Sequence, residues 1–184
     1  MNMNTGLQAR WARAFRFRGA IALAALAVGA SLAAAADSGP IGIGDTLEVI
    51  RLKDQHGQTH EIDSSIQTVI FTRDMDAGDV VREALSESEV DGAVFTRANA
   101  LYVSDISAMP AMVARLIAVP RMRKRPYPML LDRDGEVTRL FPSEAGAATI
   151  LTLDSLRVVA VGYADSSAEV RQALSVSEVE NAAD

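Results

Sequence analysis

The sequence of 184 residues contains no cysteine, and this feature limits both its fold and its chemistry. Disulfide bonds, thiolate nucleophiles and thiolate metal ligands are all excluded, because each needs a cysteine sulfur. The fold must therefore be held together by packed apolar side chains. Hydrophobic residues make up 49% of the chain, which is enough to build such a core.

The first 36 residues have the pattern of a secretory signal peptide. Four arginines precede Gly19 without any acidic residue, an apolar run of small residues occupies 21–36, and the polar chain resumes at Asp37. The apolar run has about 16 residues, fewer than the ~20 that span a bilayer. The sequence predicts export to the periplasm with cleavage near Ala36 and no stable membrane insertion afterwards. The alternative is that the signal is kept as an anchor.

Cleavage would remove four positive charges from a chain of net charge −6 and leave −10 on residues 37–184. An acidic chain is a poor match for nucleic acid or for broad contact with anionic lipid, since both bind basic surfaces. The expected partner is a periplasmic protein or small ligand of unknown identity, and no cofactor is indicated. We divide the mature chain into a flexible N-terminus at 37–46, one domain at 47–175 and a polar tail at 176–184.

The order of apolar runs and turn residues predicts an α/β domain. A β-hairpin is expected over 47–62, and residues 68–71 are typical of a buried central strand. The apolar residues within 80–85 recur with helical spacing, and Asp74 or Asp76 is placed to cap this helix.

A second strand at 101–103 and a second helix follow. The helix is predicted from a stripe of apolar residues that we interpret as core: Met109, Met112, Val113, Leu116 and Ile117. Ser107 is expected to cap this helix, and Pro120 to end it. Strand, helix and strand in this order predict a parallel βαβ unit.

The remaining elements complete the domain. A short strand is expected at 127–131, before a polar turn at 132–135. The runs 148–153 and 158–163 predict an antiparallel hairpin, and a capping box predicts a last helix over 166–174.

This order of elements resembles the thioredoxin-like fold, and two segments resemble its peroxiredoxin and redoxin branch. Residues 127–141, YPMLLDRDGEVTRLF, are similar to the segment of that branch in which a proline, two leucines and an aspartate precede a Gly-Glu-Val helix start. Residues 148–174 are similar to its closing hairpin and helix. The resemblance covers roughly residues 41–174 and implies a central mixed β-sheet flanked by helices, with an N-terminal β-hairpin.

The resemblance also implies a site at the end of the first central strand, where the family keeps cysteines at a helix N-terminus. This chain has acids there, and a carboxylate is a poor nucleophile toward disulfides or peroxides, so the redox activity does not carry over. The family's cis-proline corresponds to Ala148, or in a rival register to Pro128, with the hairpin at 129–140. The candidate binding cleft comprises Thr72, Arg73, Asp74, Asp76, Ala148 and Thr149.

Asp74 and Asp76 could bind a cation or a basic group of a partner, but helix capping with an Arg–Asp surface pair is the simpler interpretation. A basic run in this acidic chain could receive an acidic partner or phosphate, and a solvated helix end is the alternative. This candidate partner patch consists of Arg121, Arg123, Lys124 and Arg125.

Two further motifs favour ordinary turns. His56 and His60 lie in or beside the hairpin turn without an evident third ligand, so no metal site is predicted. The Asp-Arg-Asp-Gly sequence at 132–135 resembles the nucleophile motif of haloacid-dehalogenase-type phosphatases, but no lysine follows Lys124, and such enzymes need one downstream. A polar turn is the simpler interpretation.

Three hypotheses for function follow. The leading one is an exported thioredoxin-like protein without thiol redox activity, which binds a protein or small ligand as an accessory to an envelope process. The second is an enzyme that runs a non-thiol reaction with Asp74, Asp76 and Thr149. The third is a purely structural domain.

Overall fold

A computed structural model describes residues 39–86 and 93–181, with only the backbone of 176–181. Residues 36–184 form one compact unit, to which all of the described residues belong. The expected signal peptide, 1–36, lies outside the described residues. In the described part of the chain, no helix is both long and apolar enough to cross a membrane.

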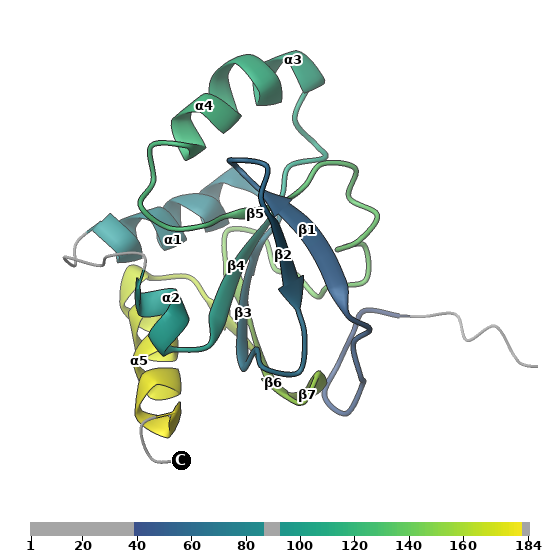
Figure 1. Cartoon of the computed structure of the whole chain (residues 1–184), viewed down its shortest axis with the longest axis vertical. Coiled ribbons are helices and arrows are strands. Elements are labelled where there is room, and N and C mark those ends of the chain that lie inside the picture. The colour runs from purple at the N-terminus through teal and green to yellow at the C-terminus, as the bar shows by residue number, and fades with distance from the viewer. Residues whose placement is uncertain (1–38, 87–92, 182–184) are drawn as a thin grey trace, which may run out of the picture. The chain divides into compact units, whose positions relative to one another are not determined.

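A mixed sheet of seven strands forms the centre of the domain, in the order β2-β1-β5-β4-β3-β6-β7 (Figure 1). The three middle strands, β5, β4 and β3, are parallel, and the outer strands pair antiparallel. The strands are β1 (Ile50–Asp54), β2 (Thr59–Ile62), β3 (Thr68–Thr72), β4 (Ala100–Asp105), β5 (Leu130–Asp132), β6 (Ala148–Asp154) and β7 (Arg157–Ala164). The two expected hairpins are confirmed, one at each edge of the sheet.

The predicted βαβ unit is also confirmed. The connection from β3 to its parallel neighbour β4 contains α1 (Met75–Ser86) and α2 (Ala93–Arg97), of which α2 was not expected from the sequence. Parallel neighbours need such a crossover, because the chain must return from the end of one strand to the edge of the sheet where the next strand starts. All five residues of β3 are buried, which explains its unbroken apolar run.

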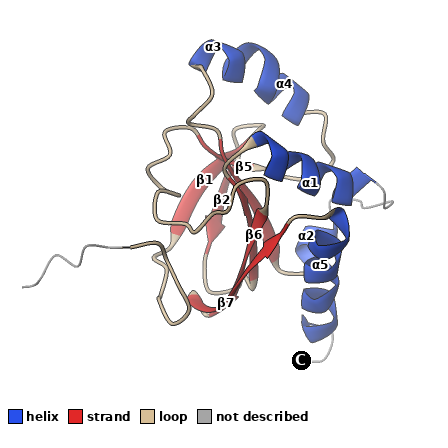
Figure 2. Ribbon diagram, turned by 180° about the vertical axis from the view of Figure 1, so that it is seen from behind, coloured by secondary structure: helices blue, strands red, loops and turns tan. Residues whose placement is uncertain are grey.

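The apolar side chains pack in two clusters, one on each face of the sheet. Alternation along β3 sends Ile70 to the first cluster, and Val69 and Phe71 to the second. Figure 2 shows α1, α2 and α5 (Ser167–Asn181) together on one side, and their buried residues other than Ala77 belong to the first cluster. Among the described residues, the second cluster contains no helical residue; loops complete it, including the loop that contributes Phe141.

The closing hairpin decides between the two registers. β6 and β7 pair through a two-residue turn, in which Ser155 and Leu156 both have positive φ angles, 50° and 71°. Such a turn matches the twist of the flanking strands. The rival register, with a hairpin at 129–140, is wrong, because β5 pairs with β4 and β1 instead.

The connection from β4 to β5 contains one continuous helical segment over residues 111–122. It comprises α3 (Ala111–Val113), the π-helical turn η1 (Ala114–Ala118) and α4 (Val119–Met122). Pro120, expected to end the helix, lies inside it. Proline has no N–H to give to the preceding turn, and the wider π spacing accommodates it, with Val119 N donating to Ala114 O. The predicted Ser107 cap is also wrong: Pro110 is the N-cap residue, without a side-chain hydrogen bond.

The apolar stripe that we interpreted as core is largely exposed. The exposed fractions are 73% for Met112, 40% for Val113, 63% for Leu116 and 47% for Ile117. Only Met109 of the stripe packs against the first cluster. Ala114 and Val119, which are smaller, are the buried residues of this segment. The helix therefore has two apolar sides, and the side with the larger residues faces outward.

The Gly-Glu-Val sequence does not start a helix, contrary to what the resemblance implies. Residues 133–141 form bends and turns around the buried carboxylate of Asp132. This carboxylate accepts hydrogen bonds from Gly135 N at 3.0 Å, Thr138 N at 2.8 Å and Thr138 Oγ1 at 2.9 Å. Its role is to shape a polar turn, as the simpler interpretation of the motif holds.

Both ends of the described chain are joined to regular structure. Ile41 N donates to Leu140 O, and Thr46 forms an isolated bridge with Arg157, so part of the expected flexible N-terminus makes ordered contacts. At the other end, α5 continues to Asn181, into the expected polar tail.

Candidate functional site

The candidate cleft lies where β3 passes into α1, and its first three residues have different surroundings. Thr72 is buried, Arg73 is half-buried and Asp74 is exposed. Ala148 and Thr149, from the neighbouring strand β6, are fully buried, and Thr149 pairs with Phe71 across the sheet. The structure therefore brings the predicted residues of β3 and β6 together. Asp76, in the first turn of α1, is exposed.

Arg73 is held by the loop that precedes β6. Its Nη2 donates to Thr138 O at 2.6 Å, its Nη1 donates to Ser143 Oγ at 3.1 Å, and its Nε lies 3.4 Å from Asp105 Oδ2. The guanidinium carbon also lies 5.1 Å from the centre of the Phe71 ring. The expected Arg–Asp pair thus forms with an aspartate of β4, not with the neighbouring acids. Arg73 fastens the loop to the sheet.

Asp74 caps α1, as predicted, and also makes a second contact. Its Oδ1 accepts a hydrogen bond from Ala77 N at 2.8 Å, which satisfies one of the free amides at the helix N-terminus. Its Oδ2 accepts from Gly146 N at 3.1 Å, in the loop just before β6. One carboxylate therefore ties the start of α1 to the start of β6.

The hydroxyl groups beneath this junction are also paired. Thr149 Oγ1 donates to Pro142 O at 2.8 Å. Thr72 Oγ1 lies 3.1 Å from the Tyr102 hydroxyl and 3.4 Å from Ser104 Oγ, in a buried group of three hydroxyls. Burial raises the pKa of Tyr102 to about 12, because the phenolate would lose its hydration, and hydrogen bonds offset this only in part. Tyr102 is therefore neutral at physiological pH.

The two histidines have separate surroundings. His60 Nε2 lies 2.9 Å from Oδ2 of the buried Asp54, whose Oδ1 accepts from His56 N and Gln58 N. Burial tends to raise the pKa of Asp54, but the hydrogen bonds from His60 and the two amides outweigh it and lower that pKa. The His56 side chain is exposed. Among the described residues, no cluster of three or more potential ligands could hold a metal ion.

Gln55, a residue that the sequence analysis did not single out, fastens the chain that follows the basic run. Its side chain is fully buried. Its Nε2 donates to Tyr127 O, and its Oε1 accepts from Met129 N, both at 2.8 Å. The backbone oxygen of Gln55 accepts from Arg123 Nε at 2.8 Å. The sequence signal was weak, because a glutamine in a polar turn resembles any solvated residue.

The structure divides the predicted basic patch. Arg121, Arg123 and Lys124 are exposed and Arg125 is half-buried, and Arg123 differs from the others because its guanidinium binds the hairpin turn. Arg115 is a further exposed arginine on the same helical segment, inside η1. Among the described residues, the ion pairs in the structure involve none of these five cations.

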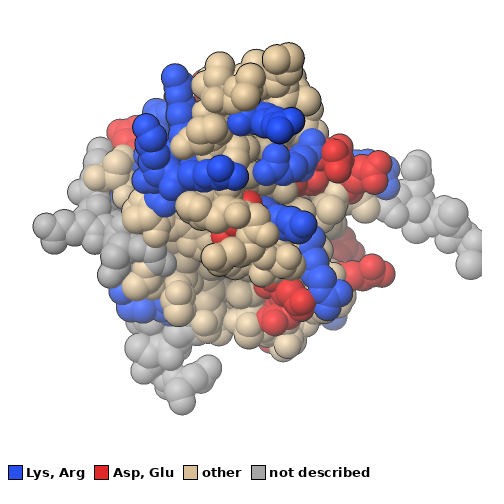
Figure 3. All heavy atoms as spheres, turned by 45° about the horizontal axis from the view of Figure 1, so that its top comes forward, with Lys and Arg blue, Asp and Glu red and all other residues tan. Residues whose placement is uncertain are grey.

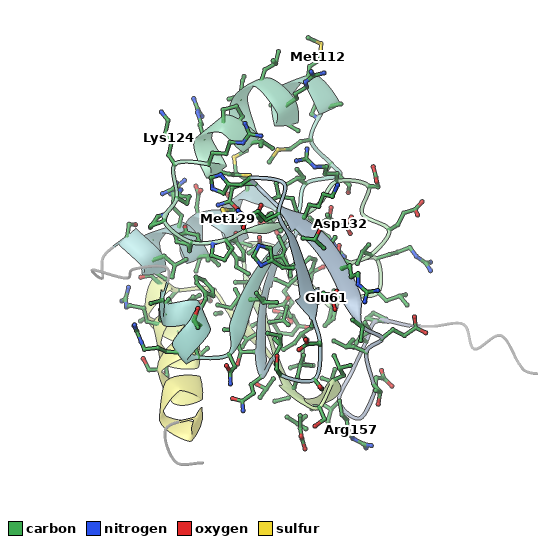
Figure 4. All side chains as sticks on the ribbon, viewed as in Figure 1. Glu61, Met112, Lys124, Met129, Asp132 and Arg157 are labelled. Carbon is green, nitrogen blue, oxygen red and sulfur yellow. The ribbon has the colours of Figure 1, made fainter. Side chains whose placement is uncertain are left out.

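We call the outward side of this segment the α3–α4 surface. It consists of the apolar residues Met112, Val113, Leu116 and Ile117 with the basic residues Arg115, Arg121 and Lys124. Figure 4 shows Met112 and Lys124 pointing away from the sheet, and Figure 3 shows Lys and Arg side chains gathered around a tan area at this end of the domain. The sequence signal for it was present, namely an apolar stripe next to a basic run, but the stripe was assigned to the core.

No protein-family model and no curated protein sequence matches the chain. Solved structures do match it. One is a putative protein disulfide isomerase from Bacteroides thetaiotaomicron, with a TM-score of 0.51 and 13% identity over 74% of this chain and 87% of that chain. Another is a hypothetical protein from Sinorhizobium meliloti, with a TM-score of 0.50 and 19% identity over 78% and 87%. Peroxidoxin BcpB from Mycobacterium tuberculosis has a TM-score of 0.47 and 20% identity over 76% and 97%.

The two matches with TM-scores of 0.51 and 0.50 show that the fold is thioredoxin-like, as the sequence resemblance implied. At such identities they show the fold alone. The chain has no cysteine, so it has no thiol redox activity.

Proposed function

We propose that this chain is an exported, non-catalytic binding protein, an accessory to an envelope process, in which the thioredoxin-type cleft serves as a structural joint. Support for export comes from the basic and apolar pattern of residues 1–36. Support for a non-catalytic role comes from the hydrogen bonds at the junction of β3 and α1.

One observation carries the proposal: the polar side chains of the cleft are engaged in joining chain segments. Arg73 binds the 138–143 loop, Asp74 binds α1 and Gly146, and Thr149 binds Pro142 O. A catalytic group must instead be within hydrogen-bonding reach of a substrate. The enzyme hypothesis is left with the exposed Asp76, and a single solvated carboxylate has no partner group with which to tune its reactivity.

The exposed surface with the most distinctive composition lies elsewhere. Ten large hydrophobic residues of the described chain are exposed, and four of them belong to the α3–α4 surface. Apolar side chains that gather on a surface, with polar residues around them, mark binding sites more often than single exposed ones do. We therefore assign the binding function to this surface.

Export is tested by cell fractionation of the chain in its own host. The expected result is release of the protein with the periplasmic contents and a mature N-terminus at Asp37, determined by N-terminal sequencing. A protein that stays in the cytosol with its first 36 residues attached would contradict the export part of the proposal.

The binding role is tested by site-specific photo-crosslinking in the same cells. A photoreactive residue at Leu116, which is 63% exposed, is expected to give an adduct that one at the still more exposed Met75 (73%) does not give. The paired changes Asp74→Asn and Asp76→Asn should leave this adduct intact, because they remove carboxylates without removing the cap acceptor. Equal labelling at both positions, or loss of the adduct in the folded double variant, would overturn the assignment.

A further inference from the structure

We infer that the α3–α4 surface docks on an anionic phospholipid bilayer, with its helix lying in the plane of the membrane interface. This inference deepens the proposed binding function by naming the partner, and it rests on that function. It does not require the segment to span the membrane.

The first argument is the separation of charge along the chain. Residues 106–131 contain five Arg or Lys and no Asp or Glu, although the whole chain has net charge −6. The connection between β4 and β5 is therefore net positive, although the chain as a whole is acidic. The acidic remainder of the domain would be repelled by anionic lipid, so the charge distribution orients this end of the domain toward such a surface.

The second argument is the amphipathic character of the exposed side of the helix. Met112 and Leu116 are four positions apart, as are Val113 and Ile117, so the four side chains form one stripe. Arg115, Arg121 and Lys124 are the exposed cations of the same surface. Long cationic side chains next to an apolar stripe can reach phosphate groups while the stripe enters the acyl region, as in helices that lie on membranes.

The third argument is the size and position of the surface. The helical segment of residues 111–122 is about 18 Å long, and its face is smaller than the ~800 Å² that each partner of a specific protein complex usually buries. The hollow lined by residues within 41–51 and 136–141 has no residue of the 111–122 helix in its lining. In Figures 1 and 2 the segment forms one extremity of the domain. A small projecting ridge suits a deformable lipid interface better than a rigid protein partner.

The test measures sedimentation of residues 37–184 with vesicles. This piece lies within the compact unit of residues 36–184, and it leaves out the N-terminal apolar run, which would itself bind lipid. Vesicles of one part phosphatidylglycerol to two parts phosphatidylcholine are expected to bind at least about tenfold more protein than pure phosphatidylcholine. Binding should fall as the salt concentration is raised from about 0.1 M to about 1 M, because the Debye length shrinks from ~10 Å to ~3 Å.

Matched variants locate the contact. Met112→Ser with Leu116→Ser, and separately Arg121→Glu with Lys124→Glu, should each lower binding by about tenfold or more. Met75→Ser is the apolar control, since Met75 and Met112 are both 73% exposed. Arg157→Glu is the charge control, because Arg157 is exposed and lies at the opposite end of the domain in Figure 4. Circular dichroism confirms that each variant is folded.

A fluorescence measurement makes the result independent of sedimentation. The single tryptophan of the chain is Trp11, so residues 37–184 contain none. A Leu116→Trp probe should show a blue shift with the anionic vesicles, and a Met75→Trp probe should show none. Equal binding to both vesicle types, wild-type binding by the surface variants, or absence of binding would each overturn the inference. If vesicle binding is absent while the cellular adduct at Leu116 is a protein, the lipid inference fails and the proposed binding function stands.

Discussion

Replacing Asp74 tests whether the old cleft has become a joint. Asp74→Ala removes the acceptor for Ala77 N at the helix N-terminus, which costs about 1 kcal/mol in most helices. It also removes a negative charge from the positive end of the α1 dipole, worth about 0.5 kcal/mol. The lost contact with Gly146 N adds about 0.5 kcal/mol, at the low end because this contact is exposed. The free energy of unfolding should fall by about 2 kcal/mol.

The assay is urea unfolding followed by circular dichroism, with the expected change in the midpoint and not in the slope. The melting temperature should fall by roughly 6 °C, given the ~3 °C per kcal/mol typical of a domain of this size. Asp74→Asn keeps a cap acceptor and should lose less than half as much. Asp76→Ala removes only an exposed charge in the first turn and should cost about 0.5 kcal/mol. Equal losses for Asp74→Ala and Asp76→Ala would refute the joint.

Three further substitutions test other contacts. Because the pKa of Tyr102 is raised from 10.0 to about 12, the unfolded chain loses the phenol proton at a lower pH than the folded protein does. The contribution of protonated Tyr102 to the free energy of unfolding is therefore complete below pH 10. It is lost as the pH rises toward 12, by up to about 3 kcal/mol. A Tyr102→Phe variant should show a correspondingly shallower alkaline loss in pH-dependent unfolding, and parallel curves would contradict this. Gly135→Ala should lower the free energy of unfolding by about 2 kcal/mol or more in a urea titration, since φ is 71° and the new Cβ would lie 2.5 Å from Ser107 Oγ. Gly57→Ala is the control: its φ is 90° but the space around it is open, so it should cost only about 1 kcal/mol. Equal costs would show that the contact with Ser107 does not contribute. Gln55→Ala leaves two buried backbone groups without partners and should lower stability by about 3 kcal/mol in the same titration, so a loss below 1 kcal/mol would contradict the assigned contacts.

The order of elements could be predicted from the sequence because local patterns determine it. The run at 68–71 predicts a buried central strand, which the structure shows as β3, and its parallel partner follows from the helix between them. Asp74 could be identified as a cap because it is a short acceptor directly before an apolar periodic run. Its second contact, with Gly146, spans 72 positions and leaves no local signal.

The exposed stripe shows where periodicity is insufficient. A repeat of apolar residues shows that a helix has an apolar side but not what covers that side. In residues 111–122 both sides are apolar, and the smaller residues Ala114 and Val119 fit closest to the sheet. The sequence rule favoured the larger residues, and the tertiary structure favoured the smaller ones. The adjacent basic run was the available warning, since cations near a stripe are typical of a helix with an outward partner.

The expected helix after Gly135 failed for a different reason. The segment resembles a known helix start. Here, however, the buried carboxylate of Asp132 accepts a hydrogen bond from Thr138 N, and Arg73 donates one to Thr138 O. Side-chain acceptors near a chain segment compete with the helical hydrogen bonds of its backbone. A resemblance between short sequence segments does not show a hydrogen-bonding partner that comes from a distant part of the chain, such as Arg73.

The crossover between β4 and β5 is anchored at both of its feet. At its start, Ile106 N donates to Asp132 O. At its end, just before β5, the side-chain amide of Gln55 forms hydrogen bonds with the backbone of Tyr127 and Met129. Between these anchors Ala114 and Val119 pack into the core, but the outward residues of the helix make no contribution to it and can vary without disturbing the strand pairing on either side. The binding specificity of such a protein can thus change through substitutions in this one connection, and a different recognition helix could be engineered between the same two anchors.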